Sequence, residues 1–78
     1  MELEFNNRNT KVKQLADHIQ RSVSMNELMP GDKLPSINTL SQKYHISRDT
    51  VFKAFNELRA RGVIESIHGK NYYVSHRL

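Results

Sequence analysis

The stretch KYHISRDTVFKAF, which runs from Lys43 to Phe55, predicts a tight turn followed by a helix with one apolar face. Ser47 supplies a hydroxyl that can cap the start of this helix. At about 100° per residue, the apolar side chains fall on one stripe, which consists of Val51, Ala54, Phe55 and Leu58. Phe52 falls outside the stripe, beside Arg48, so an aromatic ring is expected on the face that meets solvent or a partner.

The residues before this stretch predict two more helices. Apolar residues with helical spacing follow a capping hydroxyl at Thr10, and they are Val12, Leu15, Ala16, Ile19 and Val23. This first helix is expected to end near Met25. The segment ELMPGDKLPS then predicts a turn and a very short strand at Lys33–Leu34. Behind Ser36, a second helix is predicted at 37–44, with Ile37, Leu40 and Tyr44 as its buried residues.

The sequence period changes from helical to two-fold after Gly62. The runs VIESI and NYYVS, separated by HGK, predict a β-hairpin at 63–75. The expected order is therefore helix, short strand, two helices and two strands: a mainly α protein with a small β-hairpin, the winged helix-turn-helix. In this fold the helix predicted at 47–61 is the recognition helix, which lies in the major groove of DNA. A flexible N-terminal arm is expected at 1–9 and a single domain at 10–76.

The charge distribution of the chain is compatible with a polyanionic partner. The chain has 78 residues and a formal net charge of +4; charges balance as far as Ser41, so the whole excess follows Gln42. Such a one-sided basic surface suits nucleic acid, although an ordinary solvated surface explains it equally well. There is no cysteine and no apolar run of the roughly 20 residues that span a bilayer, so a cytoplasmic domain without disulfides is expected.

Four blocks of sequence carry a family resemblance. They are PGDKLPS (Pro30–Ser36), ISRDTVFKAFNEL (Ile46–Leu58), RGVIES (Arg61–Ser66) and HGKNYYV (His68–Val74). In this order and spacing they resemble the N-terminal DNA-binding domain of the GntR family of bacterial transcription regulators, over roughly Val12 to Val74. The resemblance implies a homodimer on a pseudo-palindromic operator in double-stranded DNA. It also implies a C-terminal domain, absent from this chain, that senses a small-molecule effector which this fragment does not bind.

The resemblance transfers to individual residues. The family usually has arginine at the positions of Asn38 and Phe52, and these two replacements are expected to shift base preference towards A·T pairs. Alternatively, Phe52 folds back over its helix. Arg48 is expected to reach a guanine edge, and Asp49 to orient it. The candidate DNA-binding residues are Ser36, Asn38, Lys43, Ser47, Arg48, Asp49, Thr50, Phe52, Lys53, His68, Gly69 and Lys70.

The remaining candidates have defined roles or alternatives. The lysines are expected at phosphates and the HGK turn at the minor groove. The hydroxyls of Ser36, Ser47 and Thr50 are also candidates for phosphate, and the two serines cap helices instead or in addition. Arg59 and Arg61 are attributed to the helix macrodipole alone. A protein-interaction winged helix is the competing function. The sequence shows no catalytic set, cofactor motif or metal-ligand spacing, so neither an enzyme nor a metal site is expected.

Overall fold

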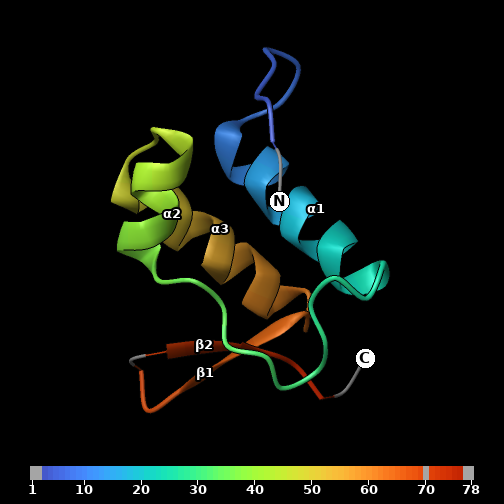
Figure 1. Cartoon of the computed structure of the whole chain (residues 1–78). Coiled ribbons are helices and arrows are strands. Elements are labelled where there is room, and N and C mark those ends of the chain that lie inside the picture. The colour runs from blue at the N-terminus through green and yellow to red at the C-terminus, as the bar shows by residue number, and fades with distance from the viewer. Residues whose placement is uncertain (1–2, 70, 77–78) are drawn as a thin grey trace.

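Three helices and an antiparallel hairpin form the computed structural model, which describes residues 3–69 and 71–76 (Figure 1). The elements are α1 (Lys11–Ser24), α2 (Ile37–Tyr44), α3 (Arg48–Ala60), β1 (Ile64–Ile67) and β2 (Asn71–Val74). The predicted winged helix-turn-helix is therefore confirmed, with the hairpin as the wing. None of the described helices is long and apolar enough to cross a membrane.

Each helix begins directly behind a hydroxyl that accepts a hydrogen bond from its first turn. Thr10 Oγ1 accepts from the amide of Lys13 at 3.1 Å, and the hydroxyls of Ser36 and Ser47 do the same for α2 and α3 at 3.0 Å. These bonds satisfy amides that have no intrahelical partner, which explains where the helices start. The helix predicted at 47–61 spans Arg48–Ala60, because its two end residues are caps.

The core lies where α3 packs against α1, α2 and β1. Its largest fully buried apolar side chains are Phe55, Leu15, Ile19, Leu40, Leu58, Val51 and Val74. Phe55 reaches from α3 to the hairpin, where its ring centroid lies 4.6 Å from that of Tyr72. Ile37 and Tyr44, which the sequence placed in the core, are only partly buried. The buried face of α3 thus fixes which side of this helix remains exposed.

The linker between α1 and α2 ties the hairpin to the helices. The amide of Leu34 donates to the carbonyl of Tyr72 at 2.8 Å, and the amide of Val74 donates to the carbonyl of Asp32 at 2.8 Å. An antiparallel bridge joins Lys33 to Tyr73, at the place of the predicted short strand. Because Leu34 is buried, the hairpin is anchored through both hydrogen bonds and apolar packing.

The segment before α1 has contacts that the sequence did not indicate. The amide of Asn6 donates to Gln14 Oε1 at 2.9 Å, and Gln14 Nε2 donates to the carbonyls of Asn6 and Asn9 at 3.0 and 2.7 Å. The ring of Phe5 meets that of Tyr44 edge-on, with centroids 6.4 Å apart. These contacts join residues 5–9 to α1 and α2, while the flexibility expected of the arm at 1–9 stays a prediction.

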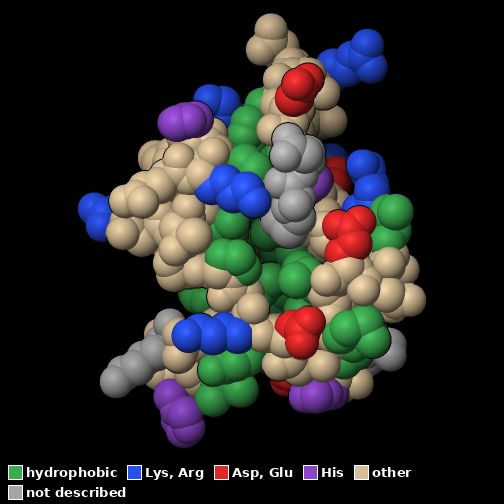
Figure 2. Space-filling model, in the orientation of Figure 1, with side chains coloured by type: hydrophobic (Ala, Val, Ile, Leu, Met, Phe, Trp, Pro, Cys, Tyr) green, Lys and Arg blue, Asp and Glu red, His purple; other side chains and the backbone are tan. Residues whose placement is uncertain are grey.

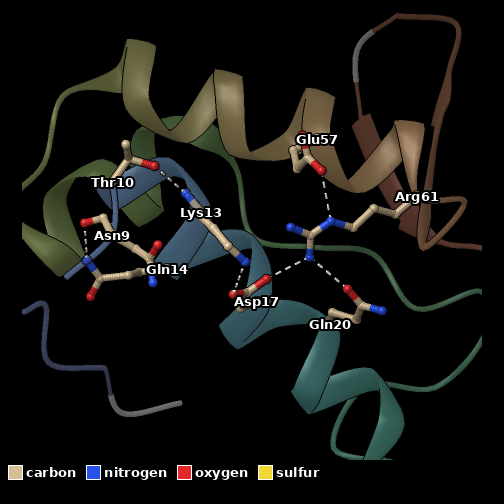
Figure 3. A network of polar contacts seen from close by, with 8 residues as sticks. All are labelled: Asn9, Thr10, Lys13, Gln14, Asp17, Gln20, Glu57 and Arg61. Carbon is tan, nitrogen blue, oxygen red and sulfur yellow. Dashed lines mark hydrogen bonds and ion pairs between the residues drawn. The ribbon is translucent and has the colours of Figure 1, made fainter.

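The prediction that Arg61, at the end of α3, is explained by the helix macrodipole alone is wrong. Its Nε donates to Glu57 at 2.9 Å, and its Nη1 donates to Asp17 and Gln20, each at 2.8 Å (Figure 3). The helix macrodipole alone therefore does not account for Arg61. Its guanidinium joins α1 to α3, and the residues it connects lie more than 40 positions apart in the sequence.

Candidate nucleic-acid interface

The turn between α2 and α3 is held by its own backbone. His45 ends α2 in the left-handed conformation, with φ of 56°. The amide of Ile46 donates to the carbonyl of Ser41 at 3.1 Å, and the Ser41 hydroxyl donates to the carbonyl of Ile46. Ile46 is buried, so the chain is fixed on both sides of the turn. Ser47 can then start α3 immediately, in a defined direction relative to α2.

The two faces of α3 have opposite character. Val51, Ala54 and Phe55 are fully buried, whereas Arg48 is exposed and the side chain of Phe52 is 44% exposed. The predicted outward position of Phe52 is confirmed. Within the part of the chain that the structure describes, Arg48 has no ion pair or hydrogen-bonding side-chain partner, so its guanidinium is available to a ligand.

Asp49 and Lys53 form an ion pair along the exposed side of α3. Lys53 Nζ lies 3.1 Å from Asp49 Oδ2, and both side chains are more than 60% exposed. Asp49 thus pairs with Lys53 in this structure rather than orienting Arg48. Exposed pairs of this kind contribute about 0–1 kcal/mol, so DNA phosphate can readily draw Lys53 away.

The hydroxyls at the starts of α2 and α3 are caps with a second bond. Ser36 Oγ donates to Thr39 Oγ1 at 2.8 Å, and the hydroxyls of Ser47 and Thr50 lie 2.8 Å apart. The capping role of both serines is confirmed. Both are exposed, and their contact with phosphate stays a prediction.

A hollow of about 320 Å³ lies between the start of α2, the start of α3 and the start of β2. It brings Asn38 and Arg48 together from two different helices. The lining consists of Leu34, Pro35, Ser36, Ile37, Asn38, Arg48, Asn71 and Tyr72. Sequence analysis placed Asn71 in the hairpin without a functional role. The only sequence feature that indicates its position near the other site residues is that it directly follows the HGK turn.

The other predicted residues lie around this hollow or away from it. His68 and Gly69 are exposed at the tip of the hairpin, both with positive φ, of 56° and 67°. Lys70 lies outside the described residues. Lys43 stands apart at the end of α2, with Nζ 5.6 Å from the centroid of the Tyr44 ring.

The charge distribution is uneven on the face that Figure 2 shows. No acidic side chain is visible over α2, where a few basic side chains lie, whereas acidic side chains are visible over the N-terminal segment, beside α1 and next to the hairpin. On this face a polyanion therefore meets less repulsion over α2.

Comparison with known proteins decides the family. The family described as "Bacterial regulatory proteins, gntR family" matches residues 11–74. The chain belongs to the GntR family. It is the DNA-binding domain of a transcription regulator and not an enzyme, as the sequence predicted, which leaves the protein-interaction alternative without support.

Individual relatives agree with this assignment. The chain is 39% identical over 62 residues to the mannosyl-D-glycerate transport/metabolism system repressor MngR of Escherichia coli, covering 80% of this chain and 26% of MngR. It is 42% identical over 48 residues to the repressor YtrA of Bacillus subtilis, covering 62% of this chain and 37% of YtrA. The matching segments thus make up only 26% and 37% of the length of these relatives.

Solved structures show the same fold. YtrA from Sulfolobus acidocaldarius, a GntR-family transcription factor, superposes with a TM-score of 0.91 and 34% identity, covering 99% of this chain and 81% of that one. The DNA-binding domain of AraR in complex with operator ORX1 superposes with a TM-score of 0.83 and 26% identity, covering 96% of both chains.

Proposed function

We propose that this domain binds double-stranded operator DNA in a sequence-specific manner, with α3 in the major groove and the hairpin tip at the adjacent minor groove. The observation that carries the proposal is the exposed face of α3, where Arg48 and Phe52 are free while the opposite face is fully buried. Residues at the start of the second helix of a helix-turn-helix are the ones that reach base edges. The AraR domain, which has the same fold and was solved in complex with its operator, supports binding of operator DNA by this domain.

Each predicted residue takes a role in this complex. Arg48 donates to the O6 and N7 acceptors of guanine, while Asn38 and Phe52 favour A·T pairs through an adenine contact and a thymine methyl. The ion pair between Asp49 and Lys53 breaks in the complex, and Lys53 contacts a phosphate instead. Phosphate is also bound by the hydroxyls at the starts of α2 and α3 and by the other lysines, which are Ser36, Ser47, Thr50, Lys43 and Lys70. His68 and Gly69 place the hairpin tip at the minor groove.

In the whole protein, two copies of the domain at 10–76 bind the two halves of a pseudo-palindromic operator in the bacterial cytoplasm, at the nucleoid. Dimerisation and sensing of a small-molecule effector belong to a C-terminal domain that lies outside this chain. The length of the relatives supports this arrangement, since the matching segment makes up 26% of MngR.

The direct test is a titration of the domain with duplex DNA from upstream of its own gene and with a scrambled duplex of equal length. Tighter binding to the upstream duplex is expected, and Arg48→Ala removes the difference. Lys70→Ala weakens binding to both duplexes and lowers the dependence of log affinity on log salt concentration by about one. Equal affinity of the unaltered domain for both duplexes contradicts sequence-specific recognition.

Phe52→Arg tests base preference separately. A guanidinium group in place of the aromatic ring is expected to move base preference from A·T towards G·C pairs. Arginine donates hydrogen bonds to the guanine acceptors, whereas an apolar side chain contacts the thymine methyl. The measurement is binding to a set of duplexes with single base-pair changes in the half-site. An unchanged preference shows that Phe52 contacts no base.

A further inference from the structure

Asn71 is the one polar residue of the hollow at α2, α3 and β2 that has no assigned role. It opens β2, is exposed, and pairs in register with Ile67 across the turn. Among the described residues, its side-chain amide has no hydrogen-bond partner. Asn71 thus has a free side-chain amide and lines the same hollow as Asn38 and Arg48.

The hollow lies between the two parts of the proposed DNA surface. On one side are the starts of α2 and α3, which face the major groove. On the other is the start of β2, next to the hairpin tip at His68 and Gly69, which faces the minor groove. Adjacent major and minor grooves are separated by one sugar-phosphate backbone. A duplex that meets both parts must therefore pass a backbone along the hollow.

The lining fits the chemistry of that backbone. Apolar groups come from Leu34, Pro35, Ile37 and Tyr72, and they suit the carbon atoms of a deoxyribose. Ser36 and Asn71 carry groups that donate to phosphate oxygens, as hydroxyl and amide groups commonly do. The hollow is also lined by Ile37 and Asn38, the first residues of α2, whose backbone amides have no acceptor within the helix.

We propose that Asn71 is a further DNA-contacting residue, whose side-chain amide donates to a phosphate oxygen of the backbone that passes along this hollow. The inference rests on the proposed DNA binding. Because the contact is to the backbone, it strengthens binding to every duplex alike and carries no direct base preference. Because the amide is neutral, it releases no counterion and does not add to the salt dependence.

Asn71→Ala distinguishes a neutral hydrogen bond to phosphate from the charged contact that a lysine makes. Affinity for the upstream and the scrambled duplex is expected to fall by the same factor of about five, the effect of one hydrogen bond, with an unchanged salt dependence. Asn7→Ala is the matched control, because Asn7 is an exposed asparagine in the N-terminal segment, at the other end of the domain from the hairpin (Figure 1). Thermal unfolding confirms that both variants fold.

A second measurement follows the side chain itself. The NMR signals of the Asn71 side-chain amide are expected to shift on addition of either duplex, while those of Asn7 stay in place. Unchanged affinity of Asn71→Ala for both duplexes, or unmoved Asn71 signals, overturns the inference, and so does a loss confined to one duplex. If the unaltered domain binds neither duplex, the proposed DNA binding itself is wrong. If the unaltered domain binds DNA but Asn71→Ala binds equally well, only the Asn71 contact is wrong.

Discussion

Replacement of Arg61 by alanine should lower the stability of the domain more than any macrodipole effect can explain. The substitution removes three hydrogen bonds, to Glu57 at 2.9 Å and to Asp17 and Gln20 at 2.8 Å (Figure 3). Two of these bonds cross from α3 to α1. The side chain of Arg61 is 23% exposed, so part of its stem is also removed from packing.

The magnitude follows from the exposure of each partner. The pair with Glu57 has helical i,i+4 spacing and is worth about 0.3–0.5 kcal/mol. Asp17 is 41% exposed, which places its pair with Arg61 at about 0.5–1 kcal/mol. A hydrogen bond to the neutral Gln20 amide adds about 0.5–1 kcal/mol. The free energy of unfolding should therefore fall by about 2 kcal/mol, which lowers the Tm of so small a domain by about 10 °C.

The assay is thermal and urea unfolding followed by circular dichroism. Arg59→Ala is the control, since Arg59 is exposed, lies in the same last turn and forms no ion pair within the described residues. It should lose only the macrodipole contribution of about 0.3–1 kcal/mol. In an Asp17→Ala background, Arg61→Ala should cost about 0.5–1 kcal/mol less than in the unaltered domain. Equal losses for Arg59→Ala and Arg61→Ala would refute the bridging role of Arg61.

The same network predicts a dependence on pH. Hydrogen bonds from Lys13 and Arg61 lower the pKa of Asp17 below its ordinary value of 3.8. A carboxyl with a depressed pKa stabilises the fold above its ordinary pKa, and this contribution disappears as the pH falls through the lower folded pKa. The extra cost of Arg61→Ala over Arg59→Ala should accordingly shrink under strongly acidic conditions.

Two further substitutions test individual contacts. Burial lowers the pKa of His18 below its ordinary 6.5, and its Nε2 has no hydrogen-bond partner among the described residues, so its contribution to stability is complete above pH 6.5 and is lost as the pH falls. His18→Gln should flatten the fall in stability as the pH drops below 6.5, measured by urea unfolding at a series of pH values. Gly31 has φ of 88°, a conformation that strains any residue with a Cβ, so Gly31→Ala should cost about 1–2 kcal/mol in urea unfolding. The added Cβ would lie 2.8 Å from the His76 ring, but this ring is the end of an exposed side chain and can turn aside. Gly62→Ala, with φ of 76° and open space around its Cβ, should therefore cost a similar amount, and a much larger cost at Gly31 would contradict this reasoning.

The candidate site was predictable where it depends on a single helix. The helical period of α3 placed Phe52 and Arg48 on one exposed face, because positions four apart in a helix are neighbours. Spacing of four also brings Asp49 to Lys53, although the sequence paired Asp49 with Arg48 instead. Several partners lie at comparable distance on a helix surface, and the choice among them depends on side-chain rotamers rather than on spacing.

The amino-acid sequence by itself determined the order of the elements, the caps that begin each helix and the membership of the GntR family. These depend on residues within one or two helical turns, or on short blocks with defined spacing, and both are visible along the chain. Only the tertiary structure decided which distant residues meet. The bridge from Arg61 to Asp17, and the hollow that joins Asn38 to Asn71, depend on how α1, α2, α3 and the hairpin pack. Burial of the apolar faces sets that packing, and no local pattern encodes the resulting side-chain partners.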